Sequence, residues 1–371
     1  MSEKKTIVWL LPRIDTVPIG GYKVVYEYAN RFAADGYDVF IVYPQFLKFS
    51  RYKNIFLNFL RRCKNLLRYS CNKIKRIRCA PDWFQLDSRI HCEYVFRFGN
   101  SRTLKIHGTK FVATAIETSF ELAGTRRIED KDKFYFIQDF ENWNGITNKR
   151  VYDSYRLPMK KITIAPWLVR EVERVGGTAA LVENGFDFDY FKMTNPIETR
   201  PACEVAMLYH RTERKRCVDA IAALKIVKEK IPCLHVAMFG TPERPDVPDW
   251  FTYFQRPDRE THNAIYNNAS IFVAASESEG FGLTVGEAMI CGCAVACTDN
   301  GGFSMMISND RTGLLSPVYD HQKLAENIIK LIENNELRIE LAKNGSEFIR
   351  QFTWERAYGK FRQEIEGANI V

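Results

Sequence analysis

The chain has 371 residues, of which 46% are hydrophobic and 26% charged, a composition that is typical of globular proteins and excludes a disordered chain. The length is too great for one ordinary core and indicates two domains. Its ten cysteines are scattered without a C-x2-C pair, which fits a protein kept in a reducing cytoplasm.

The hydropathy of the chain gives no sign of export. The first apolar run, residues 7–11, is too short for the hydrophobic part of a secretory signal and ends at Pro12. No run approaches the ~20 apolar residues of a membrane-spanning helix. We expect a cytoplasmic protein, with peripheral contact at the inner face of the membrane as an open alternative.

The first residues predict the opening of a Rossmann-like domain. An apolar strand is expected over 6–11, followed by Gly20 and Gly21, a helix over 22–34 and a second strand over 39–42. The loop lacks the G-x-G-x-x-G pattern of dinucleotide-binding proteins. A double glycine before a helix is weak evidence on its own, because plain turns also use it.

Residues 45–81 carry the positive charge of the chain. They contain eleven lysines and arginines and no acid, so the rest of the chain, with +8 overall, has a net charge of −3. Apolar residues recur among them at near-helical spacing, which predicts an amphipathic basic helix. The basic residues are Lys48, Arg51, Lys53, Arg61, Arg62, Lys64, Arg68, Lys73, Lys75, Arg76 and Arg78, and the apolar ones are Ile55, Phe56, Phe59, Leu60, Cys63, Leu66 and Leu67.

Three interpretations of this basic segment stay open. An amphipathic basic helix suits docking on an anionic membrane surface. A solvated helical insertion with one packed face is the plainer interpretation. Binding of nucleic acid is the third, but no DNA or RNA motif accompanies the segment, so we expect no nucleic-acid partner.

Strands and helices alternate in the remainder of the chain, which predicts two parallel α/β sheets. Acids follow one of the strands, at the sheet edge where such folds bind ligands: Asp139 and Glu141. Solvated loop acids are the plainer interpretation of that pair. The expected strands are 111–115, 133–137, 161–165, 204–209, 234–240, 254–255, 269–275, 292–298 and 313–315, and the expected helices include 118–123, 166–175, 258–267, 283–290, 321–334, 336–351 and one ending near 366.

The stretch 276–289 has the most specific chemistry. It follows a buried strand and leads into a helix, so Glu279 and Gly280 lie at a strand's carboxyl end. The free N–H groups and partial positive charge of the helix N-terminus suit a phosphate. Glu287 lies about one turn into the helix, and two carboxylates beside a phosphate suit the hydroxyls of a sugar and a ribose. A surface connection with solvated acids is the alternative.

Basic residues precede another helix start, where they oppose the helix dipole. Arg211 and Lys215 stand in this loop, and a bound phosphate explains their placement better than a solvated loop does. Three cysteines farther along, Cys291, Cys293 and Cys297, lie in an apolar stretch without a histidine, and we interpret them as small buried residues.

These patterns together resemble a known enzyme family. The E-x7-E spacing from Glu279 to Glu287, the R-x-x-x-K of Arg211 and Lys215, and the N-G-F-D string at 184–187 are similar to the group-1 family of retaining glycosyltransferases. Gly20-Gly21 before a helix is similar to the family's first loop. The strings T-A-I-E-T and Y-F-I-Q-D-F-E-N-W resemble its rhamnan-synthesis-F-like rhamnosyltransferase branch.

The resemblance implies the α/β GT-B fold, with two Rossmann-like domains facing across a deep cleft. Residues 1–183 would form the acceptor-side domain, which includes segment 45–81. Residues 184–352 would form the donor domain, and 353–371 a helix that crosses back to the first domain. The chain departs from the family at Arg216, where glycine is usual, at Thr284 and Ala294, where proline is frequent, and after Gly301-Gly302, where an acid is frequent.

The resemblance also implies the site. Glu279 would bind the donor sugar, Glu287 the ribose, and Arg211 and Lys215 the diphosphate. The residues expected to act in catalysis are Glu279, Arg211, Lys215 and Asp139, and those expected to bind the donor are Gly20, Gly21, Gly240, Arg256, Gly280, Phe281, Gly282, Leu283 and Glu287.

The implied reaction is transfer of a hexose or deoxyhexose, with rhamnose as the first candidate, from a nucleotide diphosphate sugar to a glycan or lipid-linked acceptor in bacterial surface polysaccharide synthesis. We expect no cofactor and no metal. Asp187 and Asp189 match the D-x-D that holds a metal in another glycosyltransferase fold, but the surrounding hinge string explains Asp187 without one. The alternatives are an epimerase or phosphorylase of the same fold and a non-catalytic nucleotide-sugar-binding subunit.

Overall fold

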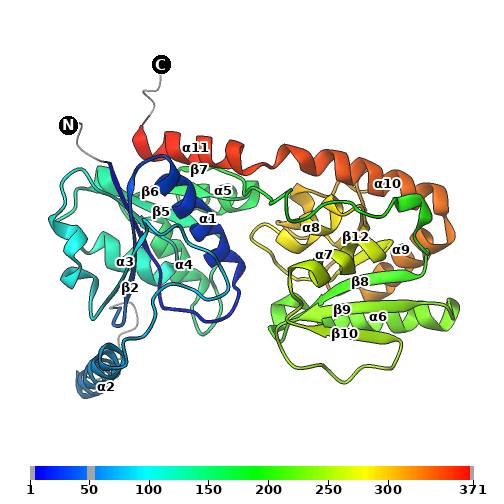
Figure 1. Cartoon of the computed structure of the whole chain (residues 1–371), viewed down its shortest axis with the longest axis horizontal. Helices are drawn as coiled ribbons and strands as arrows, with labels where there is room; N and C mark the ends of the chain where they lie inside the picture. Colours follow the sequence, from blue (N-terminus) through cyan, green and yellow to red (C-terminus); the bar gives the residue numbers. More distant parts are fainter. Residues whose placement is uncertain (1–4, 48–54, 368–371) are drawn as a thin grey trace. The chain divides into compact units, whose positions relative to one another are not determined.

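The computed structural model describes residues 5–47 and 55–367, so that Lys48, Arg51 and Lys53 of the basic segment lie outside the described residues. The chain divides into two compact units. Unit 1 consists of Met1–Val182 and Tyr358–Val371, and unit 2 of Glu183–Ala357. Figure 1 labels many of the elements of both units.

Unit 1 is built on a seven-stranded parallel sheet with the order β3-β2-β1-β4-β5-β6-β7. Its first six strands have the order of a Rossmann sheet. Strands β1 and β5 are buried along their whole length, as expected for a parallel sheet covered on both faces. The strands are β1 Thr6–Leu10, β2 Asp38–Pro44, β3 His91–Val95, β4 Lys110–Ala113, β5 Lys133–Ile137, β6 Lys160–Thr163 and β7 Ala179–Leu181.

The helices of unit 1 follow the strands in alternation. The predicted helix after the double glycine begins two residues earlier than expected, at Gly20 itself, and one helix was not predicted, over Asn148–Tyr155. The bounds are α1 Gly20–Ala34, α2 Ile55–Ile74, α3 Ile116–Ala123, α4 Asn148–Tyr155 and α5 Pro166–Glu173. Within the described part of the chain, no helix has the length and apolar content needed to cross a bilayer.

The last helix, α11 Trp354–Glu366, begins in unit 2 and ends in unit 1. Its Phe361 ring packs 5.4 Å from the ring of Trp9 and 4.4 Å from that of Tyr28. On the surface side, Arg362 donates a 2.7 Å hydrogen bond to Asp35. The expected return of the last helix to the N-terminal domain is confirmed.

Unit 2 repeats the architecture with a six-stranded parallel sheet in the order β10-β9-β8-β11-β12-β13. Its core is a continuous apolar cluster between the sheet and its helices, and α6 packs against α9. The strands are β8 Glu204–Tyr209, β9 His235–Gly240, β10 Phe251–Gln255, β11 Ile271–Ala274, β12 Ala294–Thr298 and β13 Leu314–Ser316, and the helices are α6 Cys217–Lys230, α7 Arg259–Asn268, α8 Leu283–Ile290, α9 His321–Glu333 and α10 Asn335–Phe348.

Candidate functional site

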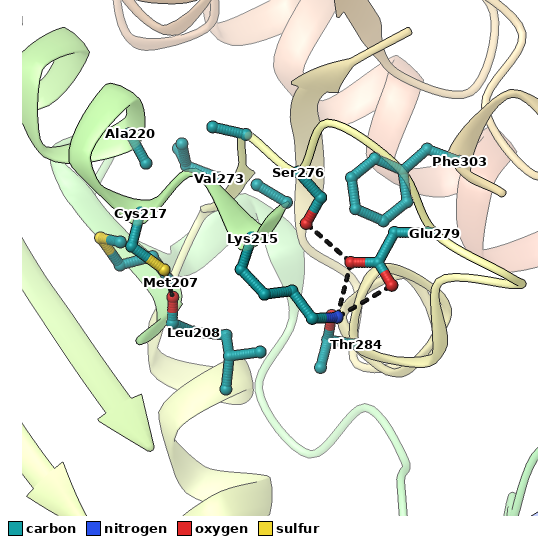
Figure 2. Close-up of a pocket in the computed structure, with 12 residues that line it drawn as sticks. Met207, Leu208, Lys215, Cys217, Ala220, Val273, Ser276, Glu279, Thr284 and Phe303 are labelled. Atoms are coloured by element: carbon teal, nitrogen blue, oxygen red, sulfur yellow. Dashed lines mark hydrogen bonds and ion pairs between the residues drawn. The ribbon is translucent and has the colours of Figure 1, made fainter. Parts of the chain in front are cut away.

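The loop between β11 and α8 forms the centre of the candidate site. It leaves the sheet at its carboxyl edge and enters α8 through Gly282, whose φ of 93° is open to glycine at little cost. Three chain segments line the small pocket that adjoins this loop, and Figure 2 shows their side chains. Among the residues that line it are Lys215, Ser276, Glu279 and Phe303.

Lys215 and Glu279 form an ion pair in this pocket. The Lys215 Nζ atom donates to both carboxylate oxygens of Glu279, at 2.7 and 2.8 Å. Ser276 Oγ donates a 2.6 Å hydrogen bond to Glu279 Oε1 (Figure 2). Glu279 and Ser276 are buried, and the Lys215 side chain is about a quarter exposed. The structure therefore brings together an acid and a base that the sequence placed 64 residues apart.

The environment keeps Glu279 ionised. Burial by itself raises the pKa of this carboxyl, but the charge of Lys215 and the hydrogen bonds from Lys215 and Ser276 outweigh burial, and the pKa lies below its usual value. At neutral pH the carboxylate is thus an acceptor with its lone pairs held in a fixed direction. Such a group is suited to accept hydrogen bonds from hydroxyl groups.

A buried amide fixes the loop that carries Glu279. Asn300 Nδ2 donates to the Ser276 carbonyl at 2.8 Å, and Asn300 Oδ1 accepts from the backbone N–H groups of Gly302 and Phe303. A Cβ at Gly302 would lie 2.6 Å from the Glu279 carbonyl oxygen, so glycine permits this close approach. Neither Ser276 nor Asn300 was predicted as a site residue from the sequence. Only the S-x-x-E spacing before Glu279 could have indicated Ser276.

Lys215 is positioned by a short turn before α6. The residues Glu213–Lys215 form one 3-10 turn, and Arg216 follows with a left-handed φ of 45°. This is the position where the family usually has glycine, and Arg216 adopts the conformation that glycine favours. Its guanidinium is held by two hydrogen bonds to Asp219, at 2.7 and 2.9 Å. The departure from the family pattern therefore leaves the turn intact.

Arg211 lies apart from this ion pair. Its guanidinium is 64% exposed and donates a 3.3 Å hydrogen bond to the exposed Glu243. Next to it, His210 accepts a hydrogen bond from the Thr212 N–H on Nδ1, so the neutral ring carries its proton on Nε2. Burial and the charge of Lys215 lower the pKa of His210. The structure brings Lys215 to Glu279 but leaves Arg211 at the surface.

Two of the expected donor-binding residues lie inside the protein. Glu287 is buried on α8, where it accepts a 3.4 Å hydrogen bond from Tyr266 Oη. The Phe281 ring packs against the rings of Phe186 and Phe352, at 5.7 and 5.9 Å. The Phe281 side chain is thus part of the apolar core. Two further expected donor-binding residues lie on either side of Phe281. Gly280 is near the end of the loop, and Leu283 is the first residue of α8.

Gly240 and Arg256 lie together at the end of β9. The Arg256 N–H donates to the Gly240 carbonyl at 2.8 Å, and Arg256 itself has a left-handed φ of 49°. A Cβ at Gly240 would lie 2.3 Å from the Tyr209 carbonyl oxygen. The glycine therefore serves the packing of β8 on β9 at this edge.

The remaining expected site residues belong to unit 1. Gly20 and Gly21 are the first residues of α1, whose Ile19 cap offers no side-chain hydrogen bond, and the Gln138 side chain lies against Gly21. Asp139 accepts a 2.8 Å hydrogen bond from the Phe140 N–H. Glu141 accepts from the Ile116 N–H at the start of α3. These residues share the carboxyl edge of the unit 1 sheet, where β1, β4 and β5 end.

The D-x-D pair has a structural use. Asp187 Oδ1 accepts hydrogen bonds from the backbone N–H groups of Asp189 and Tyr190, at 3.2 and 2.9 Å, and so closes a turn. Among the residues that the structure describes, no group of three or more His, Cys, Asp or Glu side chains is placed to hold a metal ion. Cys291, Cys293 and Cys297 are buried, as predicted.

The part of the chain that matches a known protein family lies within unit 2. Residues 203–348 match the family described as Glycosyl transferases group 1. Over these residues the chain is similar to the group-1 glycosyltransferases. The match contains Arg211, Lys215, Glu279 and Glu287, so the group-1 residues are those of the candidate site in unit 2.

A longer sequence relative is the phosphatidyl-myo-inositol mannosyltransferase of Mycolicibacterium smegmatis. It is 23% identical over 214 residues, which are 54% of this chain and 55% of that protein. The chain spans about half or less of the length of the curated relatives it matches.

Two solved structures are similar over nearly the whole chain. The sucrose-phosphate synthase of Thermosynechococcus elongatus matches with a TM-score of 0.73 and 18% identity, covering 97% of this chain and 98% of that one. Anabaena Alr3699/HepE, solved in complex with UDP and glucose, matches with a TM-score of 0.70 and 15% identity, covering 97% of this chain and 99% of that one. The chain therefore has the GT-B fold that the group-1 resemblance implied.

Proposed function

We propose that the protein is a glycosyltransferase that moves a sugar from a nucleotide diphosphate sugar to an acceptor with retention of configuration. The observation that carries the proposal is the buried Lys215–Glu279 pair at the carboxyl edge of the unit 2 sheet, beside the N-terminus of α8. The group-1 match over the same residues supports it.

In this proposal each group of the site has a task. Glu279, ionised and held by Ser276, accepts hydrogen bonds from the hydroxyls of the donor sugar. Lys215 and the N–H groups of α8 bind the diphosphate and stabilise the negative charge that develops on it as the glycosidic bond breaks. The departing diphosphate takes the proton of the acceptor hydroxyl. No protein nucleophile is needed in this scheme.

In the proposed mechanism the Lys215–Glu279 pair partly separates when a donor binds. The enclosed part of the pocket has a volume of ≈ 20 Å³, about that of one water molecule, so a sugar ring must bind at its mouth. Lys215 then exchanges part of its contact with Glu279 for a phosphate oxygen, and the freed carboxylate oxygen becomes available to the sugar. The pair keeps both groups charged and oriented until then.

The proposal also gives roles to the other expected site residues and names a donor and an acceptor. Glu287 contacts the ribose, Arg256 and Gly240 lie near the base, and Gly20, Gly21 and Asp139 act on the acceptor side from unit 1. Arg211 joins the diphosphate after leaving Glu243. The donor is a hexose or deoxyhexose nucleotide, with dTDP-rhamnose as first candidate on the strength of the Gln138-Asp139 string, and the acceptor is a glycan or lipid-linked sugar of a bacterial surface polysaccharide.

A donor panel tests the proposal. Release of free nucleotide from UDP-glucose, UDP-N-acetylglucosamine, GDP-mannose and dTDP-rhamnose would be measured with and without a mixture of glycan acceptors. We expect acceptor-stimulated release from one donor, and at least a hundredfold less from Glu279→Gln and Lys215→Ala, with circular dichroism unchanged. Isomerised donor without release would identify an epimerase. Binding without turnover of any donor would identify a non-catalytic nucleotide-sugar-binding protein.

A further inference from the structure

Helix α2 of unit 1 turns its large apolar side chains outward. Six of them, spread along the helix, are between 46% and 81% exposed: Phe56, Phe59, Leu60, Leu66, Leu67 and Ile74. Single exposed apolar residues are common on protein surfaces, but six large ones on one side of a single helix are not. The row therefore requires an explanation beyond the packing of unit 1.

The side of α2 that faces unit 1 is polar and aromatic. Asn65 Oδ1 accepts a 2.9 Å hydrogen bond from Gln45 Nε2, and Asn72 Nδ2 donates a 3.0 Å hydrogen bond to Tyr94 Oη. Tyr69 packs its ring 5.2 Å from the ring of Tyr94. An ordinary surface helix buries its apolar stripe and exposes its polar one, and α2 does the reverse.

The two sides are opposite one another by helical geometry. At about 100° per residue, the exposed apolar residues fall within an arc of about 120°, and its centre lies about 160° from Asn65 and about 180° from Asn72. Exposed basic side chains border this arc, with Lys64 and Arg68 on one side and Arg62 and Lys73 on the other. The outward surface of α2 is thus an apolar strip between two rows of positive charge.

We propose that this outward surface of α2 docks on an anionic lipid bilayer. The apolar strip would enter the boundary between headgroups and acyl chains, and the basic rows would contact lipid phosphates, as in interfacial amphipathic helices. The polar inward side keeps α2 attached to unit 1 through Gln45 and Tyr94 while its outward side is in lipid.

The charge and the apolar strip of α2 favour an anionic bilayer over a second copy of the chain or a nucleic acid. The sequence of segment 45–81 contains no acid. A second copy of the helix would therefore bring like charge against like charge. Nucleic acid would be attracted by the basic rows but gives no reason for exposed leucine and isoleucine side chains. An anionic bilayer complements both the charge and the apolar strip.

Vesicle co-sedimentation tests the proposal. The full-length protein would be mixed with vesicles of phosphatidylcholine alone and with vesicles containing phosphatidylglycerol, at low and high salt and without any donor. We expect binding to the anionic vesicles that is at least tenfold stronger than to the neutral ones and that weakens with salt. Equal binding to both, or binding to neither, would overturn the proposal, without bearing on nucleotide release.

Paired variants separate the two components of the surface. Phe59→Ser with Leu67→Ser removes apolar area at constant charge, and Arg62→Gln with Lys64→Gln removes charge at constant apolar area. Each pair should lower vesicle binding by at least tenfold. For the charge pair, about 1 kcal/mol per basic residue corresponds to about fivefold for each residue. For the serine pair, the loss comes from the apolar area that no longer enters the bilayer. The matched controls lie on α6 of unit 2, where Val218→Ser and Lys225→Gln should bind as the wild type does.

Two outcomes of the variant experiment would contradict bilayer docking. If the serine pair binds vesicles like the wild type, the apolar strip has no role at the membrane. If the wild type forms dimers by sedimentation analysis and the serine pair is monomeric, a second copy covers the strip. Circular dichroism of each variant shows whether α2 remains folded, and the controls show whether any loss is specific to it.

Discussion

Lys215 and Glu279 are the residues on which the site depends, and their burial decides how they act. A buried ion pair contributes little net stability, because desolvation of both charges offsets their attraction. Little net stability is therefore expected from the pair, which agrees with the ligand-binding role proposed for it. Asn300 and Ser276 hold the carboxylate in one orientation, which under the proposed function is the orientation that the donor sugar meets.

Loss of one partner of the pair should cost more than loss of both. We expect Lys215→Met to lower the free energy of unfolding by about 3 kcal/mol, because it leaves the Glu279 charge buried without compensation. Adding Glu279→Gln should recover most of that loss. Urea denaturation of the single and double variants measures the difference, with Lys225→Met as the exposed control. A double variant as unstable as the sum of both singles would refute this account.

At the scale of elements, the close approach of α8 to the segment at the start of unit 2 fixes where the α8 N-terminus points. The Phe186 ring lies over Gly286 of α8, and a Cβ at Gly286 would meet it at 2.1 Å. Phe186 also bridges to Thr353, which ties this segment to the chain just before α11. The helix that carries Glu287 is thus set by contacts on its glycine face.

Two glycine-to-alanine substitutions in helices should have opposite effects. Gly286→Ala should destabilise the protein by about 1–3 kcal/mol, because the added methyl group overpacks the Phe186 contact. Gly359→Ala, in α11 with nothing within 4 Å of the added Cβ, should stabilise it by about 0.5–1 kcal/mol. Thermal unfolding followed by circular dichroism compares them. Equal shifts in Tm would show that the Phe186 contact is of no consequence.

At the scale of the whole molecule, the two units repeat one sheet order, and each is completed by residues distant in sequence. Unit 1 needs Phe361 from the last helix to cover Trp9 and Tyr28. Several carboxylates that make such contacts have lowered pKa values, among them Glu279, held by Lys215, and Asp35, held by Tyr358 and Arg362. Their protonation therefore weakens both units.

Stability should fall as the solution is acidified. The Asp35 and Glu279 carboxyls have folded-state pKa values below those of the unfolded chain, so their contribution is complete above about pH 4.5 and is lost as pH falls through the folded values. The folded pKa of His210 is also lowered. Through this residue the protein loses stability already as pH falls below about 6.5, because the unfolded chain then binds a proton that the folded chain does not.

Urea midpoints measured from pH 8 to pH 3 test this dependence. We expect a small decrease between pH 7 and 5.5 that is absent in His210→Gln, and a steep one below pH 4.5. A flat profile down to pH 4 would show that neither the histidine nor the carboxylates couple protonation to folding.

Local sequence was sufficient for the fold class and for most elements. Alternating apolar strands and helices, with glycine turns at strand ends, predicted two parallel sheets, because a strand buried on both faces needs a continuous apolar run such as Ile271–Ala274. The E-x7-E spacing predicted which loop carries the acids. The helix at Asn148–Tyr155 was missed because its mean hydropathy is low and only one face is buried.

What the sequence determined by itself is the inventory of the site: its acids, its bases and the strand ends on which they stand. Tertiary structure decided which of them meet. It paired Lys215 with Glu279, left Arg211 with Glu243, and placed the Phe281 ring in the core. It also turned the apolar side of α2 outward. Periodicity gives the relative faces of a helix, but only the packing of Asn65 and Asn72 on unit 1 decides which face remains exposed.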